Sequence, residues 1–171
     1  MESTQFNTQI LNHSDKLFRF AKSILRNVDA AQDAVQELIL KLWEKRDQLD
    51  EVENMQAFTM RSMRNLCLGT IRQHREEVEI PAEIEYVEPN PYHLIERKDL
   101  AARIRLMIDN LPELQRTIIR MRDVEEMEIT EIAYVTSLTE NAVSVNLSRA
   151  RQKIREQILN EQKRVEETVW N

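Results

Sequence analysis

The chain has 171 residues, of which 42% are hydrophobic and 32% are charged, and its formal net charge is −6. One glycine and four prolines leave few turn formers for β-hairpins, and one cysteine excludes an intramolecular disulfide and a thiolate metal cluster. No apolar run approaches the length of a membrane span, and charged residues among the first twenty argue against a signal peptide. We therefore expect an all-α, cytoplasmic protein made of one medium domain or two small helical domains.

The acidic excess is confined to the middle of the chain. Residues 1–75 hold 11 basic and 10 acidic residues, residues 76–99 hold 2 and 8, and residues 100–171 hold 11 and 12. Each flank is nearly neutral and can carry a local basic stripe. The total charge therefore does not exclude nucleic-acid binding.

Two amphipathic helices are predicted in the first fifty residues, over residues 4–26 and 30–46, with Asn27 or Asp29 as the cap between them. The second predicted helix has an apolar stripe at helical spacing: Ala31, Ala34, Val35, Leu38 and Leu42. A polar edge lies beside the stripe: Asp33, Gln36, Glu37 and Lys41. This edge is either a docking surface for a partner or the solvated face of a bundle helix, and the pattern leaves both open.

An acid-free helix is predicted over residues 55–75, after a polar loop at residues 47–54. It carries four arginines in a chain that is acidic overall: Arg61, Arg64, Arg72 and Arg75. Such a surface attracts a phosphate backbone, and Phe58 at its edge could stack on an unpaired base. The alternative is that Phe58 is core and the arginines pair with the acidic loop.

Residues 76–95 are predicted to be a linker. Six glutamates precede Pro89, the stretch has no Lys or Arg, and three prolines rule out a continuous helix. The linker either occupies a positively charged groove of a partner or is a solvated tether.

Helical spacing resumes at Leu100, with Ile104, Met107, Ile108 and Leu111 on one face. Pro112 is expected at the first position of a helix over residues 113–122. The second domain would then hold four helices in about sixty residues, a size that is only marginally stable alone. The tail after Ile158 is polar and is expected to fray or to dock on a partner.

Residues 127–155 read as a helix-turn-helix: a helix over residues 129–135, a turn at Leu138, and a second helix capped by Thr139. The second helix is expected to bury Val143, Leu147, Ala150, Ile154 and Ile158. The opposite face then holds five uncharged residues, Asn141, Ser144, Val145, Ser148 and Gln152, and three arginines flank it: Arg149, Arg151 and Arg155. Small residues that reach base edges, flanked by arginines that hold phosphates, suit the DNA major groove. The alternative is a solvated bundle face.

Four stretches together resemble the extracytoplasmic-function (ECF) group of bacterial RNA polymerase sigma factors: DAAQDAVQELILKLWEKRDQL from Asp29, AFTMRSMRNLCLGTIR from Ala57, LPELQRTIIRMRDVEEMEITEIA from Leu111 and AVSVNLSRARQKIRE from Ala142. The resemblance implies a minus-ten domain over residues 1–76, a linker over 77–97, a minus-thirty-five domain over 98–160 and a tail over 161–171.

The resemblance also implies roles for individual residues. Docking on the clamp helices of the largest polymerase subunit is implied for Asp33, Gln36, Glu37, Leu40 and Lys41. The resemblance also implies that the chain contacts the flap of the second-largest polymerase subunit. Binding of the unpaired minus-ten strand is implied for Phe58, Arg61, Arg64 and Asn65, to which the acid-free helix adds Arg72. Reading of the minus-thirty-five groove is implied for Ser144, Val145, Ser148 and Arg149, with Arg151 near the backbone; Asn141 and Arg155 complete that face.

The chain departs from the family pattern at several positions. Glu126 stands where Gly is usual and Glu128 where a capping Ser is common, so the first helix of the motif is expected to start less firmly. Ser144 and Asn146 occupy positions that are often basic, which lowers the expected phosphate affinity. Gly69 replaces a frequent Asp and is expected to loosen its helix.

The leading hypothesis is thus a dissociable specificity subunit of RNA polymerase with no chemistry, cofactor or metal of its own, since no nucleophile, base and acid occur at a usable spacing. Control by an anti-sigma factor, often linked to a membrane protein, is implied by the resemblance. Two alternatives are a stand-alone helix-turn-helix regulator that does not need core polymerase, and a helical adaptor that binds only protein.

Overall fold

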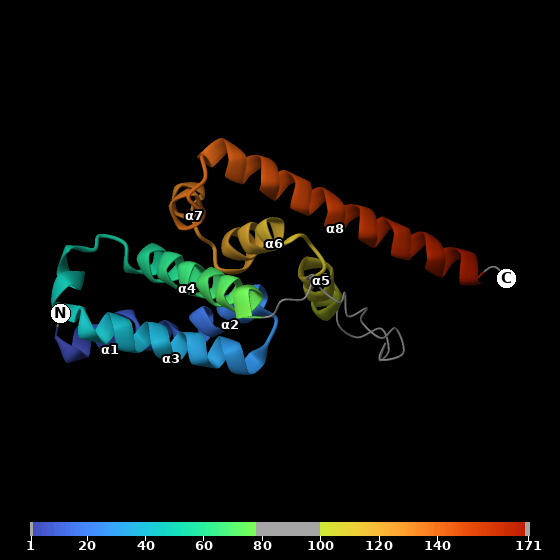
Figure 1. Cartoon of the computed structure of the whole chain (residues 1–171). Helices are drawn as coiled ribbons and strands as arrows, with labels where there is room; N and C mark the ends of the chain where they lie inside the picture. Colours follow the sequence, from blue (N-terminus) through green and yellow to red (C-terminus); the bar gives the residue numbers. More distant parts are fainter. Residues whose placement is uncertain (1, 78–99, 170–171) are drawn as a thin grey trace.

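The computed structural model describes residues 2–77 and 100–169, and it confirms the all-α prediction, since no strand occurs in these residues (Figure 1). The first half contains α1 (Ser3–Gln9), η1 (Leu11–His13), α2 (Ser14–Leu25), α3 (Val28–Glu44), η2 (Arg46–Glu51) and α4 (Met55–Glu77). The second half contains α5 (Leu100–Asp109), α6 (Glu113–Ile119), η4 (Arg120–Val124), α7 (Ile129–Thr136) and α8 (Glu140–Val169).

The prediction of one helix over residues 4–26 is wrong. The backbone leaves the helical region at Ile10 (φ −122°, ψ −57°), and the 3₁₀ turn η1 separates α1 from α2. The turn holds Asn12 and His13, which have low helix propensity, and Ser14 follows. The predicted loop at residues 47–54 also contains a 3₁₀ helix, η2, whose Leu49 is buried.

The first half is a bundle of α2, α3 and α4. Asn27 caps α3 as predicted, because its side-chain oxygen accepts a hydrogen bond from the Ala30 N–H at 2.9 Å. The predicted stripe of α3 is confirmed, with all five members buried: Ala31, Ala34, Val35, Leu38 and Leu42. On α4 the buried side chains are Ala57, Thr59, Met60, Met63 and Cys67, so Phe58, Leu66 and Ile71 are only partly covered.

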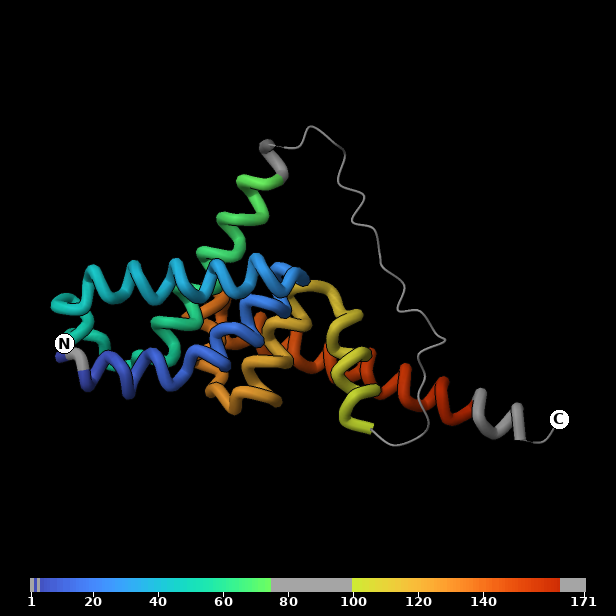
Figure 2. The backbone as a smooth tube through the Cα atoms, turned by 90° about the horizontal axis from the view of Figure 1, so that it is seen from below, coloured from blue at the N-terminus to red at the C-terminus, as the bar shows by residue number. Residues whose placement is uncertain are grey.

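In the second half, α6 is shorter than predicted. Pro112 is its N-cap rather than its first helical residue, and the α-helix ends at Ile119, where the π-helical turn η4 follows. Leu100 was placed on the buried face of α5 but is exposed, whereas Met107, Ile108 and Leu111 are buried. Beyond Ile158, where fraying is one expectation, α8 continues as a helix to Val169 (Figure 1), and Figure 2 shows α8 extending away from α2 and α3.

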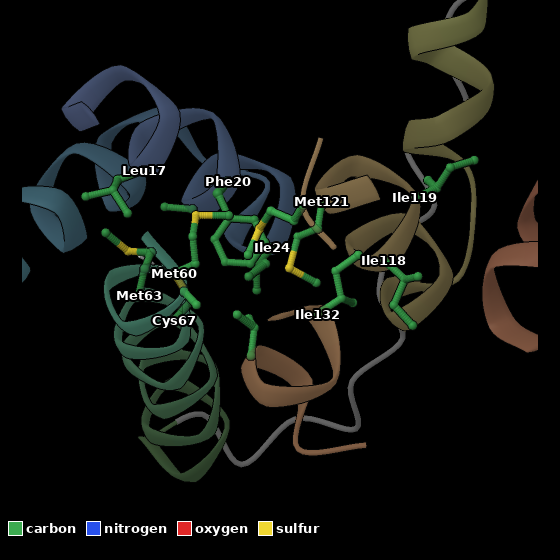
Figure 3. Packing of buried hydrophobic residues seen from close by; sticks show 14 of the residues in the cluster. Leu17, Phe20, Ile24, Met60, Met63, Cys67, Ile118, Ile119, Met121 and Ile132 are labelled. Atoms are coloured by element: carbon green, nitrogen blue, oxygen red, sulfur yellow. Dashed lines mark hydrogen bonds between the residues drawn. The ribbon is translucent and has the colours of Figure 1, made fainter. Parts of the chain in front are cut away.

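The two halves share one hydrophobic core. Helix α7 packs on α4 and α6 packs on α2, so Met121 and Ile132 of the second half lie against Phe20, Ile24 and Met60 of the first (Figure 3). Polar contacts surround this apolar junction. Glu125 pairs with Lys16 at 3.2 Å and with Arg19 at 3.4 Å, and the Asn54 side-chain amide donates to Glu131. The described halves therefore form a compact, closed arrangement.

Within residues 2–77 and 100–169, no helix is long and apolar enough to cross a membrane. The predicted linker, residues 77–97, lies outside the described residues apart from Glu77, which is the last residue of α4.

Candidate nucleic-acid interface

Helix α8 presents the predicted outward face to solvent. Its start is capped by Thr139, whose hydroxyl accepts from the Ala142 N–H at 3.2 Å, and Val143, Leu147, Ala150 and Ile154 are buried beneath it. All seven candidate groove-facing residues are exposed: Asn141, Ser144, Val145, Ser148, Arg149, Arg151 and Arg155. The exposure needed for reading DNA is confirmed, and the contacts themselves remain a prediction.

One arginine of this face is already held by the protein. Asp123 of η4 accepts two hydrogen bonds from Arg151, from Nε at 3.1 Å and from Nη2 at 2.5 Å. These bonds raise the pKa of the Arg151 guanidinium above its ordinary value. Ser144, Ser148, Gln152 and Arg155 line an open depression of about 670 Å³ around the same guanidinium.

Glu128 stands where a capping Ser is common, but the start of α7 is better capped than this replacement predicts. Glu128 is the N-cap, and the Glu131 carboxylate accepts from its backbone N–H at 2.7 Å, which completes a capping box. Glu126, in contrast, has φ 57°, a left-handed conformation that glycine adopts freely. The glutamate at this position therefore carries backbone strain of about 1 kcal/mol.

Helix α4 distributes its predicted residues over two surfaces. Phe58 and Asn65 line a groove of about 610 Å³ between α3 and α4, together with Glu37 and Lys41 of α3. Arg61 and Arg64 are partly buried instead, and Arg72 is exposed farther along the helix. Phe58 and Asn65 thus lie beside two of the candidate polymerase-docking residues. Arg61 does not line this groove.

The polar edge of α3 is accessible along its length. Its five candidate residues are exposed: Asp33, Gln36, Glu37, Leu40 and Lys41. Leu40 is 63% exposed, and Lys41 pairs with Glu37 one turn earlier at 2.6 Å. The role of this edge as a docking surface stays a prediction.

Comparison with known families matches both halves of the chain. The model described as "Sigma-70 region 2" matches residues 10–77, and the model described as "Sigma-70, region 4" matches residues 101–154. The two matches fall on the two helical halves in that order. The chain belongs to the sigma-70 family of RNA polymerase sigma factors.

The relatives that it resembles include ECF sigma factors. It is 23% identical to the ECF RNA polymerase sigma factor SigW of Bacillus subtilis, over 85% of this chain and 84% of that protein. It is 27% identical to SigV of the same organism, over 90% and 91%. Its fold matches the sigma factor RpoE of Bartonella quintana, solved with the anti-sigma factor NepR, at a TM-score of 0.71, with 23% identity and coverage of 90% and 96%. CnrH, solved with the cytosolic domain of CnrY, gives 0.65, with 21% identity and coverage of 92% and 89%.

In this sigma factor, region 4 covers part of α4. The Arg61 guanidinium lies 4.4 Å from the centre of the Tyr134 ring of α7, and its Nη2 lies 3.5 Å from the Ser137 hydroxyl. A guanidinium over an aromatic face is an attractive cation–π contact. One of the candidate minus-ten residues is therefore engaged within the chain, while the α8 face is open.

Sequence reasoning missed Asp123, Glu125 and Tyr134. Each acts on a residue far away in the chain, so no local spacing marks it. Arg116 was missed as well: it is 3% exposed, and its Nη1 donates to the Asp109 and Leu111 carbonyls at 3.1 Å each, which ties the end of α5 to α6. Burial, together with nearby Arg26, lowers the Arg116 pKa.

The sigma factor shows no arrangement for metal or thiol chemistry in residues 2–77 and 100–169. No group of three His, Cys, Asp or Glu side chains there could hold an ion. Cys67 is buried, and burial raises the pKa of its thiol to about 12, so it stays protonated at neutral pH. Its place beside Met63 in the α4 core is that of a packing residue.

Proposed function

We propose that this protein is an ECF sigma factor that binds core RNA polymerase, directs it to specific promoters and starts transcription there. The observation that carries the proposal is the pairing of two sigma regions, in family order, with an exposed polar and arginine-bearing face on α8. A phosphate backbone attracts such a face, and the small side chains at its centre leave room for base edges.

The promoter would be held at two places. Region 4 would place Ser144, Val145, Ser148 and Arg149 in the minus-thirty-five major groove, with Arg151 near the backbone. Asn141 and Arg155 would complete that face. Region 2 would hold the unpaired minus-ten strand through α4: Phe58, Arg61, Arg64, Asn65 and Arg72. Neither contact needs high affinity alone, because linked sites bind with a high effective concentration.

Core polymerase would bind the exposed edge of α3, at the clamp helices of its largest subunit: Asp33, Gln36, Glu37, Leu40 and Lys41. Region 4 would meet the flap of the second-largest subunit. Phosphodiester synthesis belongs to the polymerase, so the sigma factor itself is no enzyme and needs no cofactor. Its place of action is the cytoplasm, where polymerase and promoters are.

The closed arrangement would have to open before α4 can bind DNA, because Arg61 lies against Tyr134 and α7 covers the helix. A partner that holds the halves together would keep the sigma factor inactive. We infer that an anti-sigma factor is that partner. Of the solved structures named above, RpoE was determined with the anti-sigma factor NepR, and CnrH was determined with the cytosolic domain of CnrY.

Transcription in vitro with purified core polymerase tests the proposal. Templates would come from transcript starts mapped after overexpression of the protein. We expect specific run-off transcripts only when both core and this protein are present, and we expect Arg149→Ala to abolish them. If instead the protein binds the same promoters without core and yields no transcript with it, the stand-alone helix-turn-helix regulator is correct.

A further inference from the structure

The Asp123 carboxylate and the Arg151 guanidinium form a two-pronged contact beside the groove-facing side of α8. Nε donates to Oδ2 at 3.1 Å and Nη2 donates to Oδ1 at 2.5 Å, so the two planar groups lie edge to edge. The Arg151 side chain is 53% exposed and that of Asp123 is 35% exposed, so the pair is open to solvent on one side. Exposed pairs contribute little to stability, so its main effect is on the direction of the arginine.

The π-helical turn η4 explains why Asp123 points at α8. The Glu125 N–H donates to the Arg120 carbonyl at 3.0 Å, five residues back, and the Met127 N–H donates to the Met121 carbonyl at 2.9 Å. Met121 within the turn and Met127, three residues beyond it, are both fully buried and fix this segment in the core. Single π turns of this kind often mark functional positions. The turn therefore holds the carboxylate rigidly next to a helix that lies 28 residues later in the chain.

We propose that Asp123 is a positioning residue that fixes the Arg151 guanidinium for promoter recognition. This inference rests on the proposed function of α8. A guanidinium has five N–H donors, and the carboxylate takes two of them, so three remain to face a phosphate or a base edge. Arg149 and Arg155 have no carboxylate partner among the described residues, which makes Arg151 the oriented member of the arginine set.

The carboxylate affects specific and non-specific binding in opposite ways. Its negative charge near the DNA backbone weakens attraction to any phosphate. Its hydrogen bonds, however, already restrict the rotamers of Arg151. Less conformational entropy is therefore lost when the guanidinium binds at one defined position on the DNA. Loss of Asp123 should thus lower the preference for the correct sequence without lowering affinity for DNA in general.

The test is carried out with holoenzyme assembled from the full chain and core polymerase. Binding to a mapped promoter duplex and to the same duplex with a scrambled minus-thirty-five element is measured for wild type, Asp123→Asn, Arg151→Ala and the double variant. We expect Asp123→Asn to reduce the ratio of the two affinities about fivefold to tenfold, because one more flexible side chain must then be ordered on binding. The affinity for the scrambled duplex should stay the same or rise.

The remaining variants separate positioning from folding. Asp123→Glu, which keeps a carboxylate, should recover part of the ratio, and in the double variant Asp123→Asn should have no effect beyond that of Arg151→Ala. The inference is overturned if Asp123→Asn leaves the ratio unchanged, or if both affinities fall together with the melting temperature. If neither the wild-type holoenzyme nor the Asp123→Asn holoenzyme distinguishes the two duplexes, the proposed function itself fails, and the inference fails with it.

Discussion

Arg61 of α4 lies over the ring of Tyr134 of α7, with 4.4 Å between the guanidinium carbon and the ring centre. Each residue belongs to a different sigma region, so the contact joins α4 of region 2 to the helix-turn-helix of region 4. Tyr134 is still 45% exposed, so the contact lies at the rim of the junction rather than in its core. A rim contact of this kind can be removed without exposing the buried methionines and isoleucines beneath it.

We expect Tyr134→Ala to loosen the closed arrangement. Loss of an exposed cation–π contact removes about 0.5–1 kcal/mol, which corresponds to a severalfold rise in the open population. Fluorescence energy transfer between dyes on α3 and α8 measures this population. Tyr134→Phe keeps the ring face and is the matched control. Equal transfer in the Ala and Phe variants would show that the ring does not hold the halves together.

Glu125 provides a second, electrostatic contact across the junction. Its side chain is 7% exposed and pairs with Lys16 and Arg19 of α2. Because both cations are partly exposed, we expect Glu125→Gln to lower the free energy of unfolding by about 1 kcal/mol, measured by urea denaturation. The difference should shrink in 0.5 M salt, since screening weakens the pairs in the wild type. A difference independent of salt would assign the effect to packing.

Cys67 predicts a specific dependence on pH. Its pKa is raised to about 12 in the folded protein, above the ordinary value of 9.0 expected in the unfolded chain. Above about pH 9 the unfolded chain therefore binds fewer protons than the folded one, and the free energy of unfolding falls as pH rises toward 12. Urea denaturation at several pH values measures the slope. The Cys67→Ala variant should lose this part of it, and an identical slope in both proteins would contradict the prediction.

Gly69 replaces an Asp that is frequent in the family, and it is expected to loosen α4. A methyl group added there would meet no atom within 4 Å. Gly69→Ala should therefore stabilise the protein by up to about 1 kcal/mol, the difference in helix propensity between the two residues. Thermal unfolding followed by circular dichroism measures the change. No gain in melting temperature would mean that α4 unfolds apart from the rest of the bundle.

Much of the helical framework could be predicted because it follows from local spacing. The stripe from Ala31 to Leu42 repeats every three or four residues, and Thr139 precedes a long helical pattern, so burial and capping were predictable at both places. The break at Ile10 was not predictable from that spacing, since apolar residues continue on one face through it. Helical spacing in the sequence also continues through residues 120–124, although the backbone there forms a π turn.

The candidate site could be predicted only for each helix separately. Exposure of the α8 face follows from the stripe on its opposite side. The direction of Arg151 depends on Asp123, and that of Arg61 depends on Tyr134, and both partners come from elements that fold against them from elsewhere in the chain. Contacts of this kind depend on tertiary packing and leave no periodic signal.

The need for the two halves to separate is tested most directly by locking them together. Asn54 and Glu131 are in hydrogen-bond contact across the junction, so Asn54→Cys and Glu131→Cys, introduced with Cys67→Ala, can be joined by a cleavable bismaleimide. Run-off transcription from a mapped promoter with purified core polymerase is then measured before and after the crosslink is cleaved. We predict that the locked sigma factor yields no promoter-specific transcript and that cleavage restores it. Full activity of the locked protein would contradict the account.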